Sequence, residues 1–274
     1  MQSFHQGRSY SFRADANALG GFLEAPLPKI VHTLVPVSLP AVGGFATARS
    51  EGFNLDEIVS CSSAYTRVSG AEHRADDGSI SMLATAVVEG LNLLEVVTAK
   101  RIVTQLSISI PKGNHGLRIS LAGSRFEGLR LAGRDSQPTL NAKLNPPAGV
   151  LLTWQDIQTA GQSQAEHLIE SFKARGDKDA DQWAEERHGW MTVDPPPGGS
   201  GNLLCSLVDG FGGEGSIATC GHMVEIPGFG RFFFGELRVS HDSAQLVAIR
   251  AELGCPVTGK ISICSGGGGG TGDH

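Results

Sequence analysis

The sequence has no excess of basic residues, which argues against the commonest way of binding nucleic acid. Among its 274 residues, 22 Lys and Arg stand against 28 Asp and Glu, for a formal net charge of −6. The basic residues are scattered and form no run. A nucleic-acid interface needs clustered positive charge to displace counterions from the phosphates. We therefore expect no nucleic-acid partner.

Long hydrophobic runs are also missing. The most apolar stretch, residues 87–97, is interrupted by Glu and Asn and is too short to span a bilayer. The first residues contain no apolar segment of the kind found in secretory signals. We expect no transmembrane segment, and the default compartment is cytoplasmic. The alternatives are a mature chain that has lost its signal and export by a signal-independent route.

Cysteine is sparse, and its spacing fits neither a zinc site nor a complete set of disulfides. The five cysteines are an odd number and contain no Cys-x-x-Cys pair. Besides Cys61 they are Cys205, Cys220, Cys255 and Cys264, and these four would allow one or two bridges in an oxidising compartment. Buried reduced thiols are the favoured interpretation. The sequence predicts no metal site and no cofactor.

Common catalytic motifs are absent as well. There is no Gly-x-Ser-x-Gly, and the Gly-rich stretches at 212–215 and 266–270 do not precede a Lys-Ser/Thr helix start. The sharpest catalytic candidates are Cys220 and His222, since a cysteine and a histidine can act as nucleophile and base. Residues two apart on a strand share a face, but this alone does not set their geometry. The favoured interpretation is a core thiol beside a histidine at the start of a strand.

Glycine is abundant, with 37 residues, and it marks the most informative pattern in the chain. A Glu-Gly-Phe/Leu-x-Leu unit occurs three times, 38 residues apart, at 51–55, 89–93 and 127–131. The match extends upstream, where residues 46–48 and 84–86 are both Ala-Thr-Ala. A fixed period of this size indicates duplicated supersecondary units.

Apolar residues alternate within each copy, as in a strand with one buried face, but the phase changes at the glycine. They take even numbers before it, as in Ala84 and Ala86, and odd numbers after it, as in Leu91 and Leu93. We favour a β-bulge with glycine at positive φ, and a tight hairpin at Glu-Gly is the alternative. The structural glycines are Gly52, Gly90 and Gly128.

The glutamate of each copy has two interpretations. Glu51, Glu89 and Glu127 could form a row that binds a cation or a partner. Isolated surface carboxylates are more often solvated, and we favour that interpretation.

Composition divides the chain into five segments. A helical insertion is expected because Ser163 and Glu166 have the spacing of a capping box, Gly176 can end that helix, and a second helix follows with Trp183 as its apolar anchor. After it, strands at 222–226, 231–239 and 245–253 with short turns predict an antiparallel meander. The expected organisation is a repeated β region at 9–150, a helical insertion at 151–193, a Pro/Gly linker at 194–201, a β-meander at 202–264 that packs with the first region, and a flexible Gly-rich tail at 265–274.

Two stretches resemble known proteins. Residues 87–99, VVEGLNLLEVVTA, and residues 221–230, GHMVEIPGFG, are similar to stretches from a group of uncharacterised bacterial proteins. The first also resembles repeat-bearing bacterial surface domains of the choice-of-anchor type. The resemblance implies a bacterial β-repeat protein and no particular activity. Such surface domains usually carry export signals and anchors, which are not visible here, and no functional residue is carried over.

Together these features predict an all-β protein of mainly antiparallel sheets with a short helical insertion, built as a β-sandwich or a short β-solenoid. The expected function is that of a non-enzymatic structural or binding protein that self-associates through strand edges or repeat faces. One alternative is a hydrolase that uses Cys220 and His222 between the sheet and the insertion. Another is a carbohydrate-binding module in which exposed Trp154, Trp183 or Trp190 stacks on sugars. The sequence does not identify a small-molecule or glycan ligand.

Overall fold

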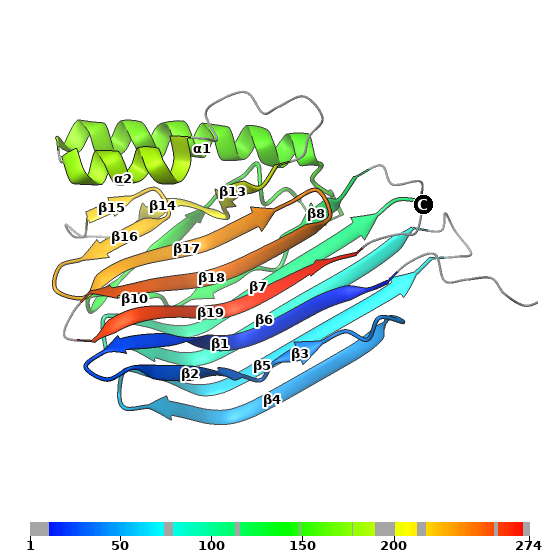
Figure 1. Cartoon of the computed structure of the whole chain (residues 1–274), viewed down its shortest axis with the longest axis horizontal. Coiled ribbons are helices and arrows are strands. Elements are labelled where there is room, and N and C mark those ends of the chain that lie inside the picture. Colours follow the sequence, from blue (N-terminus) through cyan, green and yellow to red (C-terminus); the bar gives the residue numbers. More distant parts are fainter. Residues whose placement is uncertain are drawn as a thin grey trace, which may run out of the picture.

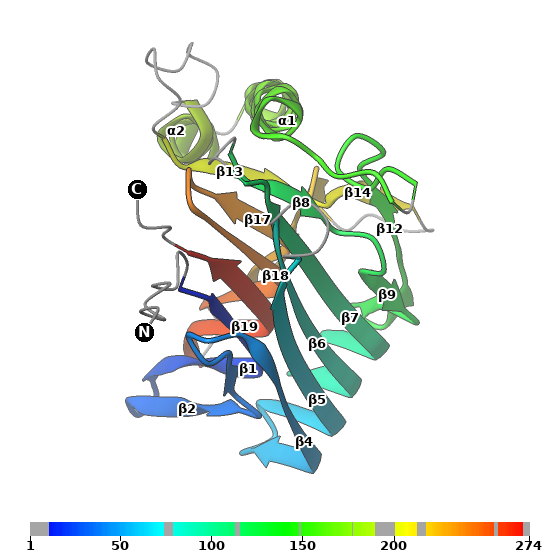
Figure 2. The same ribbon diagram turned by 90° about the vertical axis from the view of Figure 1, so that its right-hand side faces the viewer.

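Among the residues that it describes, the computed structural model has two large antiparallel β-sheets packed face to face, with two helices at one end (Figure 1; Figure 2). The structure describes residues 11–73, 79–112, 116–147, 149–176, 178–189, 201–212, 218–254 and 257–270. We name the two layers the repeat sheet, which contains the three repeats, and the terminal sheet, which contains the first and last strands. The predicted all-β fold with a helical insertion is confirmed, and its architecture is a sandwich.

The repeat sheet has the strand order β11-β10-β7-β6-β5-β4, with β8 and β9 also paired to β7. Its strands are β4 (Gly44–Leu55), β5 (Val59–Glu72), β6 (Ile80–Leu93), β7 (Val97–Ile110), β8 (Arg118–Ser120), β9 (Arg125–Glu127), β10 (Arg130–Leu131) and β11 (Arg134–Asp135). The 38-residue period therefore corresponds to consecutive hairpins, first β4–β5, then β6–β7, then the short strands β9 to β11.

The terminal sheet has the order β15-β16-β17-β18-β19-β1-β2, with β13 beside β17 and β3 beside β1. Its strands are β1 (Arg13–Ala25), β2 (Lys29–Leu34), β3 (Val37–Ser38), β13 (Leu203–Ser206), β15 (Ala218–Cys220), β16 (Met223–Ile226), β17 (Gly230–Val239), β18 (Ser243–Gly254) and β19 (Thr258–Gly269). A separate two-stranded ladder joins β12 (Gln137–Leu140) to β14 (Val208–Gly212). The predicted meander is confirmed as β16, β17 and β18.

The core lies between the two sheets, which Figure 2 shows edge-on. Its largest cluster combines Val88 and Leu91 of β6 with Phe232 and Phe234 of β17. Phe233, between those two phenylalanines, points to the opposite face and packs against the helices. The strand period of two therefore gives β17 two apolar faces, one for each neighbouring layer.

The three repeat glycines share one backbone conformation. Their φ angles are 78° at Gly52, 60° at Gly90 and 59° at Gly128, in the region that favours glycine. In β6 the buried residues change from even to odd numbers at Gly90, as predicted. The alternative of a hairpin at Glu-Gly is wrong, because β4 and β6 continue through this point.

The glycine does not form an ordinary bulge, because the side chains of the neighbouring strand also exchange faces at the same level. Glu89 pairs with Arg101 and Leu91 pairs with Ala99, so the register of β6 against β7 is unchanged across Gly90. The same holds for β5 against β4 and against β6. The prediction of a bulge with two residues opposite one is wrong in this respect. The residues at this level form a row across the sheet, which we call the kink row: Gly52, Ser62, Gly90, Lys100 and Gly128.

The terminal sheet has a similar row. Gly235 has a φ of 66° and Cys264 a φ of 50°, and the register is unchanged on both sides of each. They lie at the level of Ala248 and Ala18 in the adjacent strands. In each sheet, the side chains therefore exchange faces at one level across the strands, and the strand pairing is retained.

The hairpin turns repeat with the same period as the glycines. The residues at positive φ in these turns are Asp56 and Glu57, Leu94 and Glu95, and Ala132 and Gly133. Two successive positive φ angles are typical of a type I′ turn. In the first two turns, the Asn54 and Asn92 side-chain oxygens accept hydrogen bonds from the Glu57 and Glu95 N–H groups, at 3.2 and 2.8 Å. These bonds explain the asparagine in the repeated motif.

The helical insertion consists of α1 (Trp154–Arg175) and α2 (Lys178–His188). Thr153 is the N-cap of α1 and forms a capping box with Asp156. The prediction that Ser163 begins the helix is therefore wrong, whereas Gly176 ends it as predicted, with a φ of 70°. The helices lie at the β15–β17 end of the terminal sheet, away from β2 and β4 (Figure 1; Figure 2). Neither helix has the length and apolar character that crossing a bilayer requires.

The prediction of a flexible tail at 265–274 is wrong for residues 265–269. They belong to β19, which lies between β18 and β1 in the terminal sheet. An added Cβ at Gly266 would lie 3.1 Å from the Ala84 Cβ, and one at Gly268 would lie 3.0 Å from the Ile108 Cδ1. These glycines therefore allow close approach of the two sheets. Residues 271–274, and the predicted linker at 194–201 apart from Gly201, lie outside the described residues.

Candidate functional site

Cys220 and His222 belong to a tight turn between β15 and β16. Cys220 pairs with Met223, and Gly221 between them adopts a φ of 54°. The Cys220 Sγ lies 3.8 Å from the Leu168 carbonyl oxygen on α1, and the residue is only 2% exposed. Reactive cysteines are partly exposed to their substrates. This burial favours the core-thiol interpretation of Cys220.

The other described cysteines are also buried free thiols, namely Cys61, Cys205 and Cys264. Burial raises the pKa of the Cys205 thiol to about 12, and it raises the pKa of Cys61 and of Cys264. A raised pKa disfavours the thiolate, which is the reactive form. These thiols serve as small apolar core residues. Cys255 lies outside the described residues.

A buried group of charged side chains lies beside His222, where α2 packs on the outer face of the terminal sheet. We call it the Glu236 cluster. Arg250 donates to both Glu236 oxygens, with its Nη2 at 2.9 Å from Oε1, and Arg187 of α2 donates to Oε1 at 2.8 Å. The His222 Nε2 is 3.9 Å from the same oxygen, too far for a hydrogen bond. The cluster ties α2 to β17 and β18.

The pKa values in the Glu236 cluster show which charges are present. Burial alone would raise the pKa of Glu236, but the hydrogen bonds from Arg250 and the interaction with His222 hold it well below its ordinary value. Burial lowers the pKa of His188, whose ring contacts that of His222, to about 3, with help from the nearby His222 and Arg187. Glu236 is therefore ionised and His188 neutral at pH 7. A carboxylate saturated by two arginines fits an anchoring role.

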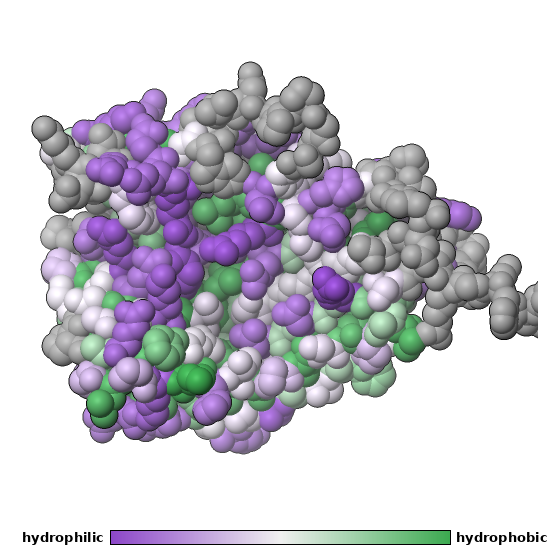
Figure 3. All heavy atoms as spheres, viewed as in Figure 1, coloured by the Kyte–Doolittle hydropathy of each residue, from purple (hydrophilic) through white to green (hydrophobic). Residues whose placement is uncertain are grey.

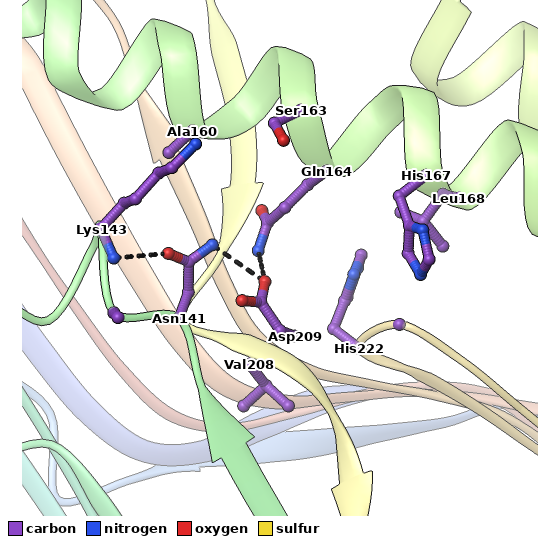
Figure 4. A pocket seen from close by; sticks show the side chains of 12 residues that line it. Asn141, Lys143, Ala160, Ser163, Gln164, His167, Leu168, Val208, Asp209 and His222 are labelled. Carbon is purple, nitrogen blue, oxygen red and sulfur yellow. Dashed lines mark hydrogen bonds between the residues drawn. The ribbon is translucent and has the colours of Figure 1, made fainter.

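An open pocket of about 390 Å³ lies between α1 and the loops at this end of the sandwich (Figure 4). Its volume falls in the range of small-molecule sites, roughly 300–1,000 Å³. Of the two predicted site residues, the structure brings His222 to the pocket, whereas Cys220 is not among the lining residues. The lining residues are Asn141, Ala142, Lys143, Ala160, Ser163, Gln164, His167, Leu168, Val208, Asp209, Gly221 and His222.

A hydrogen-bonded network orients the carboxylate of Asp209 in this pocket. Asp209 Oδ1 accepts from Asn141 Nδ2 at 2.9 Å and from Gln164 Nε2 at 2.6 Å. Further hydrogen bonds, each at 2.8 Å, hold both amides in place. Asn141 Oδ1 accepts from the Lys143 N–H, and the Gln164 side chain accepts from the Ser206 N–H and donates to the Ser206 carbonyl oxygen. The sequence could not reveal this site, since its members come from β14, α1 and the segment after β12.

The repeat glutamates lie apart on the exposed side of the repeat sheet, and each has an arginine partner. The pairs are Arg49–Glu51 at 2.7 Å, Arg101–Glu89 at 3.5 Å and Arg125–Glu127 at 2.5 Å. Within the part of the chain that the structure describes, no group of three or more His, Cys, Asp or Glu is arranged to hold a metal. The arrangement favours solvated ion pairs over a shared cation site.

The two described tryptophans pack within the protein. Trp183 lies against Phe172 and Phe233, with ring centroids 5.6 and 5.8 Å apart. Trp154 is partly buried against the sandwich core, and Trp190 lies outside the described residues. These positions favour core packing over stacking on a sugar.

The strand β4 is a long edge strand whose inner face is incompletely covered. Its 12 residues pair with β5 on one side, and no described strand pairs with the other side. The repeat allows an internal comparison, because residues 38 apart have equivalent places in β4 and β6. Ala46, Ala48, Phe53 and Leu55 are half-buried, whereas Ala84, Ala86, Leu91 and Leu93 are buried. β6 has a paired strand on each side, β5 and β7, whereas β4 has one on a single side.

Several exposed apolar side chains belong to β1, β2 and β4 and the turns between β1 and β4. Phe45 of β4 is 72% exposed, and the others are Phe22, Leu27, Ile30 and Val42. Figure 3 shows apolar side chains interspersed with polar ones in the lower part of the molecule, where Figure 1 places β1 to β4. Apolar surface beside an unpaired strand edge is typical of an interaction site.

Comparison with known proteins places this architecture in a family. The model of a domain of unknown function, DUF8256, matches residues 10–240. The chain belongs to the DUF8256 family. No curated protein and no solved structure matches it.

The DUF8256 match includes β4, every residue that lines the pocket, and Glu236. Arg250 and the central strand β19 lie beyond its last matched residue. The family description names no activity, so function is inferred from the pocket and the β4 edge.

Proposed function

We propose that this protein is a non-enzymatic structural β-sandwich that self-associates by pairing the β4 edges of two copies. The observation that carries the proposal is the half-covered inner face of β4, compared with the covered face of β6 in the next repeat. An unpaired edge presents N–H and C=O groups that a second strand can satisfy. Proteins commonly protect such edges with proline or lysine, and residues 44–55 contain neither.

A second copy of β4 is the favoured partner because the edge is self-complementary in charge. Arg49 and Glu51 lie two residues apart and face the same side of the strand. Antiparallel pairing about a two-fold axis at Ser50 places Arg49 of each copy opposite Glu51 of the other. Such cross-strand pairs stabilise by about 0.2–1 kcal/mol each, whereas like charges destabilise. The two ion pairs would select this register.

Reversing one charge tests the proposal. Arg49→Glu should weaken association by about tenfold, because two ion pairs become two repulsive pairs across the two-fold axis. Sedimentation velocity over a micromolar concentration series measures the dissociation constant. Arg49→Glu combined with Glu51→Arg should restore association, since the exchanged charges again face opposite signs.

Arg67→Glu is the matched control. Arg67 is an exposed residue on β5, one strand away from the edge, and carries the same charge change. It should leave association unchanged. A wild-type protein that stays monomeric over the whole series would contradict the proposal, as would an Arg67→Glu variant that weakens association as much as Arg49→Glu.

A further inference from the structure

The pocket beneath α1 contains a carboxylate oxygen that is held in place and open to solvent. The Asn141 and Gln164 amides both donate to Asp209 Oδ1. Oδ2 receives no hydrogen bond from a residue that the structure describes, and no described cation forms an ion pair with the carboxylate. A positioned carboxylate with a free oxygen favours a ligand that donates a hydrogen bond.

His222 is a second polar group at the pocket, and its ring also borders the Glu236 cluster. Its side chain is only 5% exposed, and its Nε2 forms no hydrogen bond in the described part of the chain but lies 3.9 Å from the Glu236 Oε1. The residue also lines the pocket. His222 therefore forms part of the pocket wall, with its Nε2 near Glu236.

The remaining lining residues indicate the chemistry of the ligand. Lys143 and Asp209 contribute one positive and one negative charge, and Figure 4 shows them on either side of Asn141. Ser163 and His167 on α1 add groups that can donate or accept. Donors and acceptors that alternate with no net charge suit hydroxyl groups, because each hydroxyl both donates and accepts.

We propose that this pocket binds a small neutral polyhydroxylated ring, of the sugar or polyol class. Asp209 Oδ2 accepts a hydrogen bond from one hydroxyl, and Lys143 donates to another. Leu168 and Val208 contact the C–H face of the ring. The pocket lies at the helical end of the sandwich, away from β4, so the proposal stands independently of self-association.

Saturation-transfer difference NMR with myo-inositol, D-glucose and D-galactose as probes tests the site. The wild-type protein should transfer saturation to at least one of them. Asp209→Asn should weaken that binding by about tenfold or more, because it replaces the free acceptor with a donor. The asparagine oxygen can still accept from Asn141 and Gln164, so the network should survive. Ser163→Trp, at an exposed position on α1, should block the pocket without altering the core.

Glu166→Gln is the control, since Glu166 is exposed on the same helix and the change removes one negative charge. This variant should bind like the wild type, and thermal unfolding of each variant verifies that it is folded. The proposal is overturned if none of the three probes receives saturation, or if binding survives Asp209→Asn. Stronger transfer to glucosamine or glucuronate than to the neutral rings would also overturn it.

Discussion

Replacing Glu236 with glutamine should lower the free energy of unfolding by about 3–5 kcal/mol, as expected when one member of a buried ion group is removed. Arg250 and Arg187 both donate to this carboxylate, which is 2% exposed. Glutamine would turn an amide N–H toward one guanidinium and remove the carboxylate that Arg187 and Arg250 share, so that Arg250 keeps only its pair with Glu252 among the described carboxylates. The pKa of Glu236 is lowered, so its stabilisation is complete above its ordinary pKa of 4.5 and is lost in acid. Urea unfolding near pH 7 measures the loss.

Glu225→Gln is the matched control for this change. Glu225 lies on the adjacent strand β16 and pairs with Arg231 at 3.8 Å, with both side chains partly exposed. Its replacement should cost less than about 1 kcal/mol, as for other surface ion pairs. If the Glu236 variant loses no more stability than the Glu225 variant, the cluster does not anchor α2.

The second large effect is expected at the kink row. Gly90→Ala should destabilise the protein by about 2–3 kcal/mol, because alanine is strained at positive φ and also collides with the next strand. The φ of Gly90 is 60°, and an added Cβ would lie 2.6 Å from the Ser62 Oγ and 3.0 Å from its Cβ. Urea unfolding of the variant measures the loss.

Gly52→Ala separates the two causes. Gly52 has a similar φ of 78°, but an added Cβ there would meet nothing within 4 Å. Only the backbone strain remains, which costs about 1 kcal/mol. Ser62→Gly in the Gly90→Ala background should recover the difference, because it removes the colliding side chain. Equal losses at Gly52 and Gly90, or no recovery, would mean that the kink row does not cross the strands as described.

The repeat made much of this sheet predictable from the sequence. The period of 38, the change of phase at Gly90 and the need for positive φ all followed from the pattern of residues. The residues that lie opposite these glycines could not be predicted, because nothing in the sequence around Ser62 and Lys100 indicates that they pair with a glycine. The alternation of apolar residues along a strand indicates which of its own residues face the core. It does not indicate which residues of the neighbouring strand lie opposite them, because that register depends on strand pairing.

Prediction from the sequence also fails where the same residues are compatible with two different structures. The glycines at 266–270 predict a flexible tail, yet Gly266 and Gly268 lie in β19 where the sheets approach closely. Thr153 and Asp156 have the same capping spacing as Ser163 and Glu166, and only the tertiary packing of α1 shows which pair begins the helix. The Asp209 network cannot be predicted from the sequence, because Asn141, Gln164 and Asp209 are brought together only by the fold.

Amide hydrogen exchange at two protein concentrations tests the β4 edge most directly. If two copies pair through it, exchange within residues 45–51 slows as the concentration rises through the dissociation constant. Amides of β2, the edge strand of the other sheet, keep their rates and serve as the internal reference. Unchanged exchange in β4 while the protein associates, or slowing confined to β2, would contradict pairing through β4.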